Sequence, residues 1–225
     1  MKKIILLAVL FSLGIHLSAQ KFYSTTSGEI ILSLAEINSG DMPAPQNIVR
    51  FSPWFNVQTL GNYDFGKNAG MFFGLNLRNV GFIAKDNSTQ IKKKYRVYDI
   101  GFPIGFKLGN IDRFFFYGGY EFELPFNYKE KTFENEIKTG NFNAWFSNRV
   151  PTYYHALFVG IQFPYGTNLK FKYYLTPFHN SNFEEIVDGE TIKPYKNLEA
   201  NVFYIALSFT MFRNSAVYYK YESHH

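Results

Sequence analysis

Residues 49–65 read VRFSPWFNVQTLGNYDF, and the alternation within this stretch decides the predicted fold. Most odd positions are apolar or small: Val49, Phe51, Pro53, Phe55, Val57, Thr59, Gly61, Tyr63 and Phe65. Most even positions are polar: Arg50, Ser52, Trp54, Asn56, Gln58, Leu60, Asn62 and Asp64. Because successive side chains of a β-strand point to opposite faces, the stretch predicts a strand with one face toward lipid and the other toward a polar interior.

Other stretches follow the same period of two. The clear ones are 71–78, 95–108, 114–128, 169–175 and 203–211, and the weaker ones are 29–37 and 153–163. We expect Tyr128 to face outward, and Glu121 and Glu123 to face inward. The alternation slips near Asn79 and Val80, which predicts a β-bulge near the rim.

The connections between these strands alternate in length. Long ones lie at 38–48, 84–94, 129–152 and 176–202, and short ones lie at 66–70, 109–113 and 164–168. Outer-membrane barrels have short periplasmic turns and longer external loops. The sequence therefore predicts an all-β fold, a closed antiparallel transmembrane barrel of about eight strands with both termini in the periplasm.

Two features bear on the strand limits. The apolar face of 203–212 is expected to close the ring, and the rival closing strand contains Tyr218, Tyr219 and Tyr221. Proline cannot donate a hydrogen bond to the ladder, so a proline inside a strand marks a bulge, a rim or a wrong strand limit. This applies to Pro53, Pro103 and Pro125.

The start of the chain predicts a cleavable signal peptide over 1–19, followed by a barrel over 20–225 with a short C-terminal tail. Lys2 and Lys3 are positively charged, residues 4–17 are apolar, and Ala19 completes a small-residue cleavage site. A buried N-terminal helix is the alternative. The chain has no Cys, so we expect neither a disulfide, nor a thiolate metal site, nor a lipid-modified cysteine.

Composition excludes two other classes of protein. Without Lys2 and Lys3 the formal net charge of +5 falls to +3, and these charges are interleaved with acids, so no nucleic-acid partner is expected. Aromatic residues make up 20% of the chain. No apolar run after the N-terminus approaches the roughly 20 residues of a membrane-spanning helix.

The stretch IGFPIGFKL at 100–108 resembles a strand of the outer-membrane β-barrel proteins that are abundant in Bacteroidetes. The segments RFSPWF at 50–55 and GLNLRNVGF at 74–82 share this similarity. Gly101 and Gly105 stand where bulkier residues are more usual in that family. The resemblance implies the fold and the location but no activity, because the family is functionally mixed.

Charged groups of both signs occupy the inward positions: Arg50, Asp64, Arg78, Asp99, Lys107, Glu121, Glu123, Lys170 and Lys172. Eight strands leave a lumen just wide enough for side chains to fill, so we expect these groups to form an interior polar network. The alternative is that Glu121 and Glu123 work as an acid–base pair with one raised pKa.

Histidines are the other candidates for chemistry. His155 shares the parity of outward residues, so it is expected near lipid or headgroups rather than as a general base. His179 precedes Glu184, Glu185 and Asp188, but this spacing matches no metal template, and a solvated acidic loop is expected. His224 and His225 close the chain. The sequence therefore predicts no catalytic residue, metal or cofactor.

Two connections carry candidate contacts. Lys92, Lys93 and Lys94 lie in the second external loop, where they either contact lipopolysaccharide phosphates or only solubilise the loop. The third loop is too apolar to lie free in water, so we expect a lid over the barrel mouth or a docking surface. Its apolar residues are Phe133, Ile137, Phe142, Trp145, Phe146 and Val150.

The function expected from these features is a non-catalytic outer-membrane barrel that is a subunit or docking element of a larger assembly. Its expected partners are outer-membrane lipid, lipopolysaccharide and another outer-membrane protein. The alternatives are a lipid-modifying or proteolytic barrel enzyme and a small pore.

Overall fold

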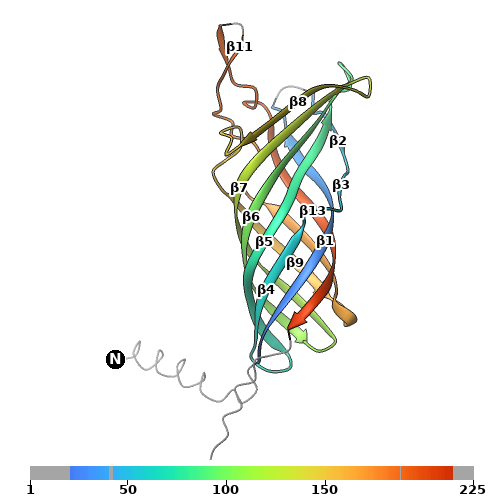
Figure 1. The fold of residues 1–225 in the computed structure, drawn as a ribbon. Coiled ribbons are helices and arrows are strands. Elements are labelled where there is room, and N and C mark those ends of the chain that lie inside the picture. Colours follow the sequence, from blue (N-terminus) through green and yellow to red (C-terminus); the bar gives the residue numbers. More distant parts are fainter. Residues whose placement is uncertain (1–20, 41–42, 188, 215–225) are drawn as a thin grey trace, which may run out of the picture.

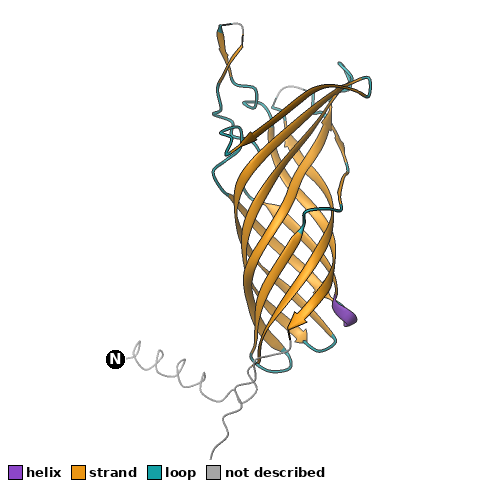
Figure 2. Cartoon of the chain, viewed as in Figure 1, coloured by secondary structure: helices purple, strands orange, loops and turns teal. Residues whose placement is uncertain are grey.

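A computed structural model describes residues 21–40, 43–187 and 189–214, which are built mainly of β-strands (Figures 1 and 2). The strands are β1 (Lys21–Asn38), β2 (Gln46–Ile48), β3 (Arg50–Ser52), β4 (Val57–Asp64), β5 (Ala69–Lys85), β6 (Ile91–Asn110), β7 (Phe114–Glu134), β8 (Ile137–Trp145), β9 (Tyr154–Gln162), β10 (Thr167–Tyr174), β11 (Glu185–Val187), β12 (Glu190–Ile192) and β13 (Glu199–Asn214). A short 3-10 turn, η1 (Pro164–Gly166), precedes β10. In the described part of the chain, no helix has the length and apolar character needed to cross a membrane.

Eight strands form a ring in the order β1, β4, β5, β6, β7, β9, β10 and β13. The ring closes because β13 pairs with β1, with Leu207 opposite Ile30. Neighbouring strands are antiparallel throughout. The predicted closed eight-stranded barrel is confirmed, with β13 as the closing strand. Tyr218, Tyr219 and Tyr221 lie outside the described residues.

Three short turns lie together at one end of the barrel, and the longest connections lie at the other (Figure 1). The turns at 65–68, 111–113 and 163–166 lie at the end where β1 begins and β13 ends. We call this the short-turn end. The described residues of the longer connections, 39–40, 43–45, 135–153 (with β8), 175–187 and 189–198, lie at the opposite end, as does the five-residue turn at 86–90; we call this the long-loop end.

Two predicted loops are largely strand. Most of 84–94 belongs to β5 and β6, which leaves a turn at 86–90 and places Lys92, Lys93 and Lys94 in β6. Most of 129–152 is a hairpin, because β7 runs to Glu134 and β8 pairs with it. Beyond the lipid neither face of a strand must be apolar, so the alternation that reveals a strand disappears there.

The outward face of the ring is an apolar belt. Its exposed residues include Ile30, Leu32, Val57, Phe73, Leu75, Leu77, Ile100, Phe102, Ile104, Phe106, Leu108, Phe116, Leu124, Leu157, Val159, Leu169, Phe171, Ile205, Leu207 and Phe209. In water such a large apolar surface would promote aggregation, whereas in a membrane it would contact the lipid hydrocarbon. The period of two therefore separates a lipid-facing belt from the interior.

The interior changes from polar to apolar along the barrel axis. The β-bulge predicted near Asn79 and Val80 is wrong, because the β5–β6 register continues without a shift through both residues. Val80 and Phe82 point inward like Arg78, and they are buried in an apolar core near the long-loop end. The apparent slip in the sequence marks this change in the interior.

A bulge does occur in β7, and Pro125 lies at it. The β6–β7 register shifts by one residue, because Asp99 pairs with Pro125 whereas Tyr98 pairs with Asn127. This shift turns Tyr128 into the core, where it is fully buried, so its predicted outward orientation is wrong. The extra residue reverses the parity of everything that follows it in β7.

The other two prolines interrupt ladders in different ways. Pro103 stays within β6, where the β5–β6 pairing skips the two residues between Gly101 and Ile104. Pro53 ends β3, and the chain bends through Phe55 at a φ of 63° before β4 begins. Trp54 lies in this bend and is 75% exposed, so its expected inward orientation is wrong.

Leu207→Arg should prevent membrane insertion and heat-modifiable migration on a gel. Leu207 lies on the apolar belt between its partners in β1 and β10, and an outward arginine near the bilayer midplane costs about 2–4 kcal/mol. Thr89→Arg, in the exposed turn at 86–90, is the control and should insert normally. Normal migration of Leu207→Arg would contradict the assignment of this face to lipid.

Candidate functional site

A layer of charged side chains crosses the middle of the barrel, and Arg78 of β5 lies at its centre. Arg78 Nε donates a hydrogen bond to Glu29 Oε2 over 3.0 Å. Its Nη1 forms an ion pair with Glu121 and a longer one with Glu123 at 3.4 Å. Its Nη2 donates to Gln58 Oε1 over 3.1 Å. The fork of donors on one guanidinium thus joins β5 to three other strands, β1, β4 and β7.

Two lysines complete the charged layer. Lys170 of β10 forms an ion pair with Glu29 of β1. Lys172 bridges Glu121, at 2.8 Å, and Glu123. All five side chains are buried, so each charge depends on its partners rather than on water.

Asp99 is the member of this layer whose carboxylate has no hydrogen-bond partner in the described part of the chain. It lies opposite Arg78 in the β5–β6 ladder and is fully buried. Among the described residues neither of its carboxylate oxygens has a hydrogen-bond partner. The layer holds the cations Arg78, Lys170 and Lys172 and the carboxylates Glu29, Asp99, Glu121 and Glu123. Replacing the Asp99 carboxylate would therefore break no ion pair.

The charged layer fills the lumen. Glu121 and Glu123 are 1% and 0% exposed, and both are held by Arg78 and Lys172. A substrate would have to displace this network to reach them. The arrangement suits a plug better than an acid–base pair.

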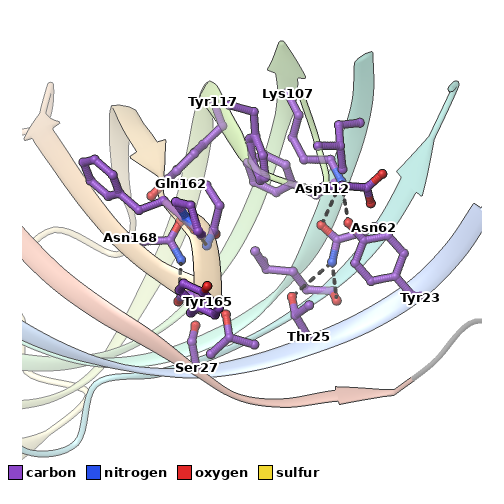
Figure 3. Close-up of a pocket in the computed structure, with 18 of the residues that line it drawn as sticks. Tyr23, Thr25, Ser27, Asn62, Lys107, Asp112, Tyr117, Gln162, Tyr165 and Asn168 are labelled. Atoms are coloured by element: carbon purple, nitrogen blue, oxygen red, sulfur yellow. Dashed lines mark hydrogen bonds between the residues drawn. The ribbon is translucent and has the colours of Figure 1, made fainter. Parts of the chain in front are cut away.

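A second pair, Lys107 with Asp64, lies nearer the short-turn end. Lys107 also donates to Tyr23 and Asn62, each over 3.2 Å. Lys107, Tyr23 and Asn62 border a cavity of about 380 Å³ that opens between the short turns, and Tyr117 lines it from β7 (Figure 3). The lumen therefore holds a cavity at the short-turn end and is closed by the charged layer at the middle of the barrel.

Arg50 does not join the network. It holds β3 against β5, donating to the Asn79 carbonyl over 3.1 Å and to the Asn79 side chain. Glu29, in contrast, is an interior charge that the sequence analysis missed. The buried small residues Ser27 and Ser33 share its parity, and this pattern could have shown that it faces inward.

An aromatic cap closes the long-loop end of the interior. His179 stacks on Tyr195 at 4.1 Å between ring centroids and contacts Phe82, Tyr95 and Phe178 through its edges. The cap is carried by the connection at 175–198, not by the β7–β8 hairpin. The apolar residue Val150 is buried in the same core.

A ring of polar groups anchors this cap. The Tyr195 hydroxyl accepts a hydrogen bond from Arg149 over 2.9 Å and donates to Glu130 over 3.1 Å. Partial burial acts to lower the pKa of Arg149, and the hydrogen bond to Tyr195 with the charge of Glu185 outweighs it and raises that pKa. Arg149 therefore stays charged and ties the cap to β7.

The acidic side chains of the loop that follows His179 form separate ion pairs. Glu185 pairs with Arg149, and Glu184 pairs with Lys193 at 3.1 Å. Asp188 lies outside the described residues. Within the described residues no three His, Asp or Glu side chains gather as metal ligands.

The three lysines of the predicted second loop diverge. Lys93 pairs with Glu130 at 3.1 Å. Lys92 pairs with Glu136, and the ammonium groups of Lys92 and Lys94 lie over the Phe133 ring at 5.3 and 5.0 Å from its centroid. Lys92 and Lys94 therefore share one face of the sheet, and Lys93 lies on the other. Lys94 lies in register with Lys131 of β7.

The apolar residues of the predicted third loop also separate. Phe133 lies beneath the two lysines, and Phe142 contacts Arg149 at 4.2 Å. Trp145 stacks on Phe126 at 5.7 Å. Ile137 and Phe146 are 70% and 77% exposed. Only part of the predicted docking or lid surface is therefore available to a partner.

An outer aromatic girdle follows the apolar belt on the long-loop side, formed by Tyr98, Phe122, Phe126, Trp145 and Tyr153. His155 packs beside it, with ring centroids 5.0 Å from Tyr153, and its Nδ1 is hydrogen-bonded to the Tyr120 hydroxyl. Aromatic rings of this kind gather where a barrel meets the membrane interface. His155 thus faces outward, where its parity predicts it.

The closed ring, the apolar belt, the aromatic girdle and the filled interior define the class of transmembrane β-barrels. No family model matches the chain, and no curated protein matches it.

Several solved structures of outer-membrane proteins are similar to it. The attachment invasion locus protein Ail of Yersinia pestis, solved with the heparin analogue sucrose octasulfate, is 11% identical, with a TM-score of 0.39 over 86% of this chain and 99% of Ail. Neisserial surface protein A is 8% identical, with a TM-score of 0.39 over 86% of this chain and 99% of that protein. OprG from Pseudomonas aeruginosa is 10% identical, with a TM-score of 0.39 over 87% of this chain and 97% of OprG. Likenesses this distant carry no argument about ligands or function.

Arg78→Met should strongly destabilise the barrel. Removing one partner from a buried ion-pair network typically costs about 3–5 kcal/mol, because the remaining charges stay buried and unpaired. The measurement is the urea midpoint of the protein folded into lipid vesicles. Arg113→Met, in an exposed turn at the short-turn end, is the control. Adding Glu121→Gln to Arg78→Met should recover part of the loss, and equal midpoints for Arg78→Met and Arg113→Met would contradict the importance of the layer.

The aromatic cap should loosen in acid. Burial, with the charges of Lys93 and Arg149, lowers the pKa of His179 well below its usual 6.5. The unfolded cap therefore binds a proton that the folded cap excludes, and folding of the cap loses stability as the pH falls below about 6.5. Proteolysis of 175–198 should accelerate on acidification. The variant His179→Phe keeps an aromatic ring that cannot titrate, so its rate of proteolysis should not depend on pH in this way. If His179→Phe showed the same pH dependence as the unmodified protein, the mechanism would be contradicted.

Proposed function

We propose that the protein is a non-catalytic integral outer-membrane β-barrel that docks a second outer-membrane protein at its long-loop end. The observation that carries this proposal is the contrast between a filled lumen and a projecting hairpin with a free strand edge. Because side chains fill the lumen, we expect contacts with other molecules on the outside of the barrel, at the long-loop ends of β6 and β7 and on β8, which we call the extension.

The location in the outer membrane is part of the proposal. The apolar belt fits lipid, and transmembrane barrels with short turns at one end and long loops at the other are typical of that membrane. The proposed topology has a signal peptide over 1–19, both termini in the periplasm and the long-loop end outside the cell. Membership of the Bacteroidetes barrel family stays a prediction.

The β7–β8 hairpin supports the docking role. Among the described strands β8 pairs only with β7, so its other edge presents unpaired backbone groups over nine residues. An exposed edge of this length is a ready template for a strand from another chain. Ile137 at its start and Phe146 just beyond its end are exposed apolar residues that a bound strand could cover.

The two alternatives find less support in the geometry. A pore would need a path past Arg78, Lys172 and their carboxylates, all buried in one layer. An enzyme acting through the His155 ring would need a nucleophile or a carboxylate against that ring, but the ring contacts Tyr120, Phe122 and Tyr153, and the Thr176 hydroxyl accepts a hydrogen bond from the His155 backbone N–H instead.

Ile137→Glu with Phe146→Glu should abolish cross-linking of a partner in cells, because charge on both flanks of the free edge opposes burial there. The measurement places a photo-reactive residue at Asn141 of β8 and weighs the complex after purification in mild detergent. Tyr165→Glu, a fully exposed site at the short-turn end, is the matched control. A strictly monomeric protein with no cross-link from Asn141 would contradict the docking role.

A further inference from the structure

Cationic side chains face one another across three strands on the outward surface of the extension. Lys94 of β6 is paired in register with Lys131 of β7, and Arg96 is paired with Lys129. Lys138 of β8 lies beside them. We call these five residues the cationic array. Like charges directly opposite each other on one face of a sheet destabilise it, so this arrangement requires an explanation.

No acid of the described chain is in ion-pair contact with the cationic array, and Glu136, the acid that feels the charge of Lys94, is paired with Lys92. None of its five members forms an ion pair among the described residues, although Lys92 and Lys93 next to it do. Partial burial lowers the pKa of Lys131, and the charges of Arg96, Lys138, Lys94 and Lys129 lower it further. The array therefore carries a net positive charge with no direct ion-pair partner among the described residues.

Two adjoining hollows give the cationic array the shape of a binding surface. The first, of about 320 Å³, is lined only by Arg96, Lys129, Lys131 and Lys138 with Asn141 and Asn143. Every lining residue offers N–H donors. The second hollow, of about 490 Å³, shares Arg96 and Lys131 and adds apolar walls from Phe51, Trp54 and Phe133. A molecule that fills both hollows would place an anionic group in the first and an apolar group in the second.

The height of the cationic array along the barrel indicates where this occupant comes from. On the outward face of β6, Ile100 belongs to the apolar belt, Tyr98 to the aromatic girdle, and Arg96 and Lys94 follow in turn. Lys129 lies over the Tyr98 ring at 5.2 Å from its centroid. The array thus begins one step beyond the membrane interface, at the level of lipid headgroups.

We propose that the cationic array binds the phosphate-bearing headgroup of an anionic lipid, the lipid A part of lipopolysaccharide in the outer leaflet. Charge complementarity carries the assignment: the donor-lined hollow takes a phosphate, and the hollow walled by Phe51 and Trp54 takes the adjoining apolar part of the lipid. The inference rests on the outer-membrane location proposed above. It replaces the lysine triplet at 92–94 with residues that only the pairing of β6, β7 and β8 brings together.

The test titrates the full-length barrel in neutral detergent with diphosphoryl lipid A and counts bound lipid by native mass spectrometry. The variant Lys94→Gln/Arg96→Gln/Lys129→Gln/Lys131→Gln should bind at least about tenfold more weakly, because four charges at headgroup level are removed. The matched control is Lys67→Gln/Arg113→Gln/Lys193→Gln/Lys196→Gln, which removes four exposed cations elsewhere and leaves the same net charge. The control should bind as the unmodified protein does.

Three further measurements make the result specific. Lipid A stripped of phosphate should bind weakly, and millimolar inorganic phosphate should compete only partially, because it fills one hollow. The array variant should unfold at the same or a higher urea concentration than the unmodified protein, since cross-strand repulsion is relieved. A large drop in this urea concentration would indicate a merely structural role and overturn the proposal.

Other outcomes also overturn the proposal. Equal weakening of the array variant and the control would show that net charge alone attracts lipid. Tighter binding of soluble heparin than of lipid A would assign the array to a sulfated polysaccharide. These results are independent of location in cells: a barrel found outside the outer membrane would defeat the proposed function, whereas a barrel in that membrane without lipid A affinity would defeat only this inference.

Discussion

Every backbone N–H and C=O group that faces lipid must find a partner within the protein, because the hydrocarbon layer offers no water. The pairing of β13 with β1 meets this requirement by leaving the ring of eight strands without an edge. Closure then dictates the rest: one face of each strand meets lipid, and the other meets a lumen too narrow to remain empty. The apolar belt and the charged layer are two consequences of the same constraint.

The filling of the lumen differs from one end to the other. Arg78 and its partners occupy the middle, the aromatic core with Phe82 and His179 closes the long-loop end, and the cavity beside Lys107 remains at the short-turn end. Charges can be buried in the middle because each cation there contacts a carboxylate. In a barrel filled in this way, the binding surfaces that we propose lie on the outside, on β6, β7 and β8.

These external strands combine two features that serve different partners. The free edge of β8 suits a polypeptide, and the cationic array beneath it suits an anionic lipid. Both follow from strands that continue past the membrane, where neighbours in the ladder stay paired but the lipid no longer selects apolar side chains. Lys94 and Arg96 can therefore face outward on the same strand as Ile100 and Phe102.

The sequence by itself determined the closed eight-stranded barrel and most of its lipid-facing residues, because alternation along one strand depends only on the period of two. It did not determine the bulge that turns Tyr128 inward, the bend that exposes Trp54, or the strands hidden at 84–94 and 129–152. Tertiary structure alone decided that Glu29 joins Arg78, that Arg50 binds Asn79 instead, and that Lys94 faces Lys131. These contacts join different strands, and their register is set by closure of the whole ring, which no single segment encodes.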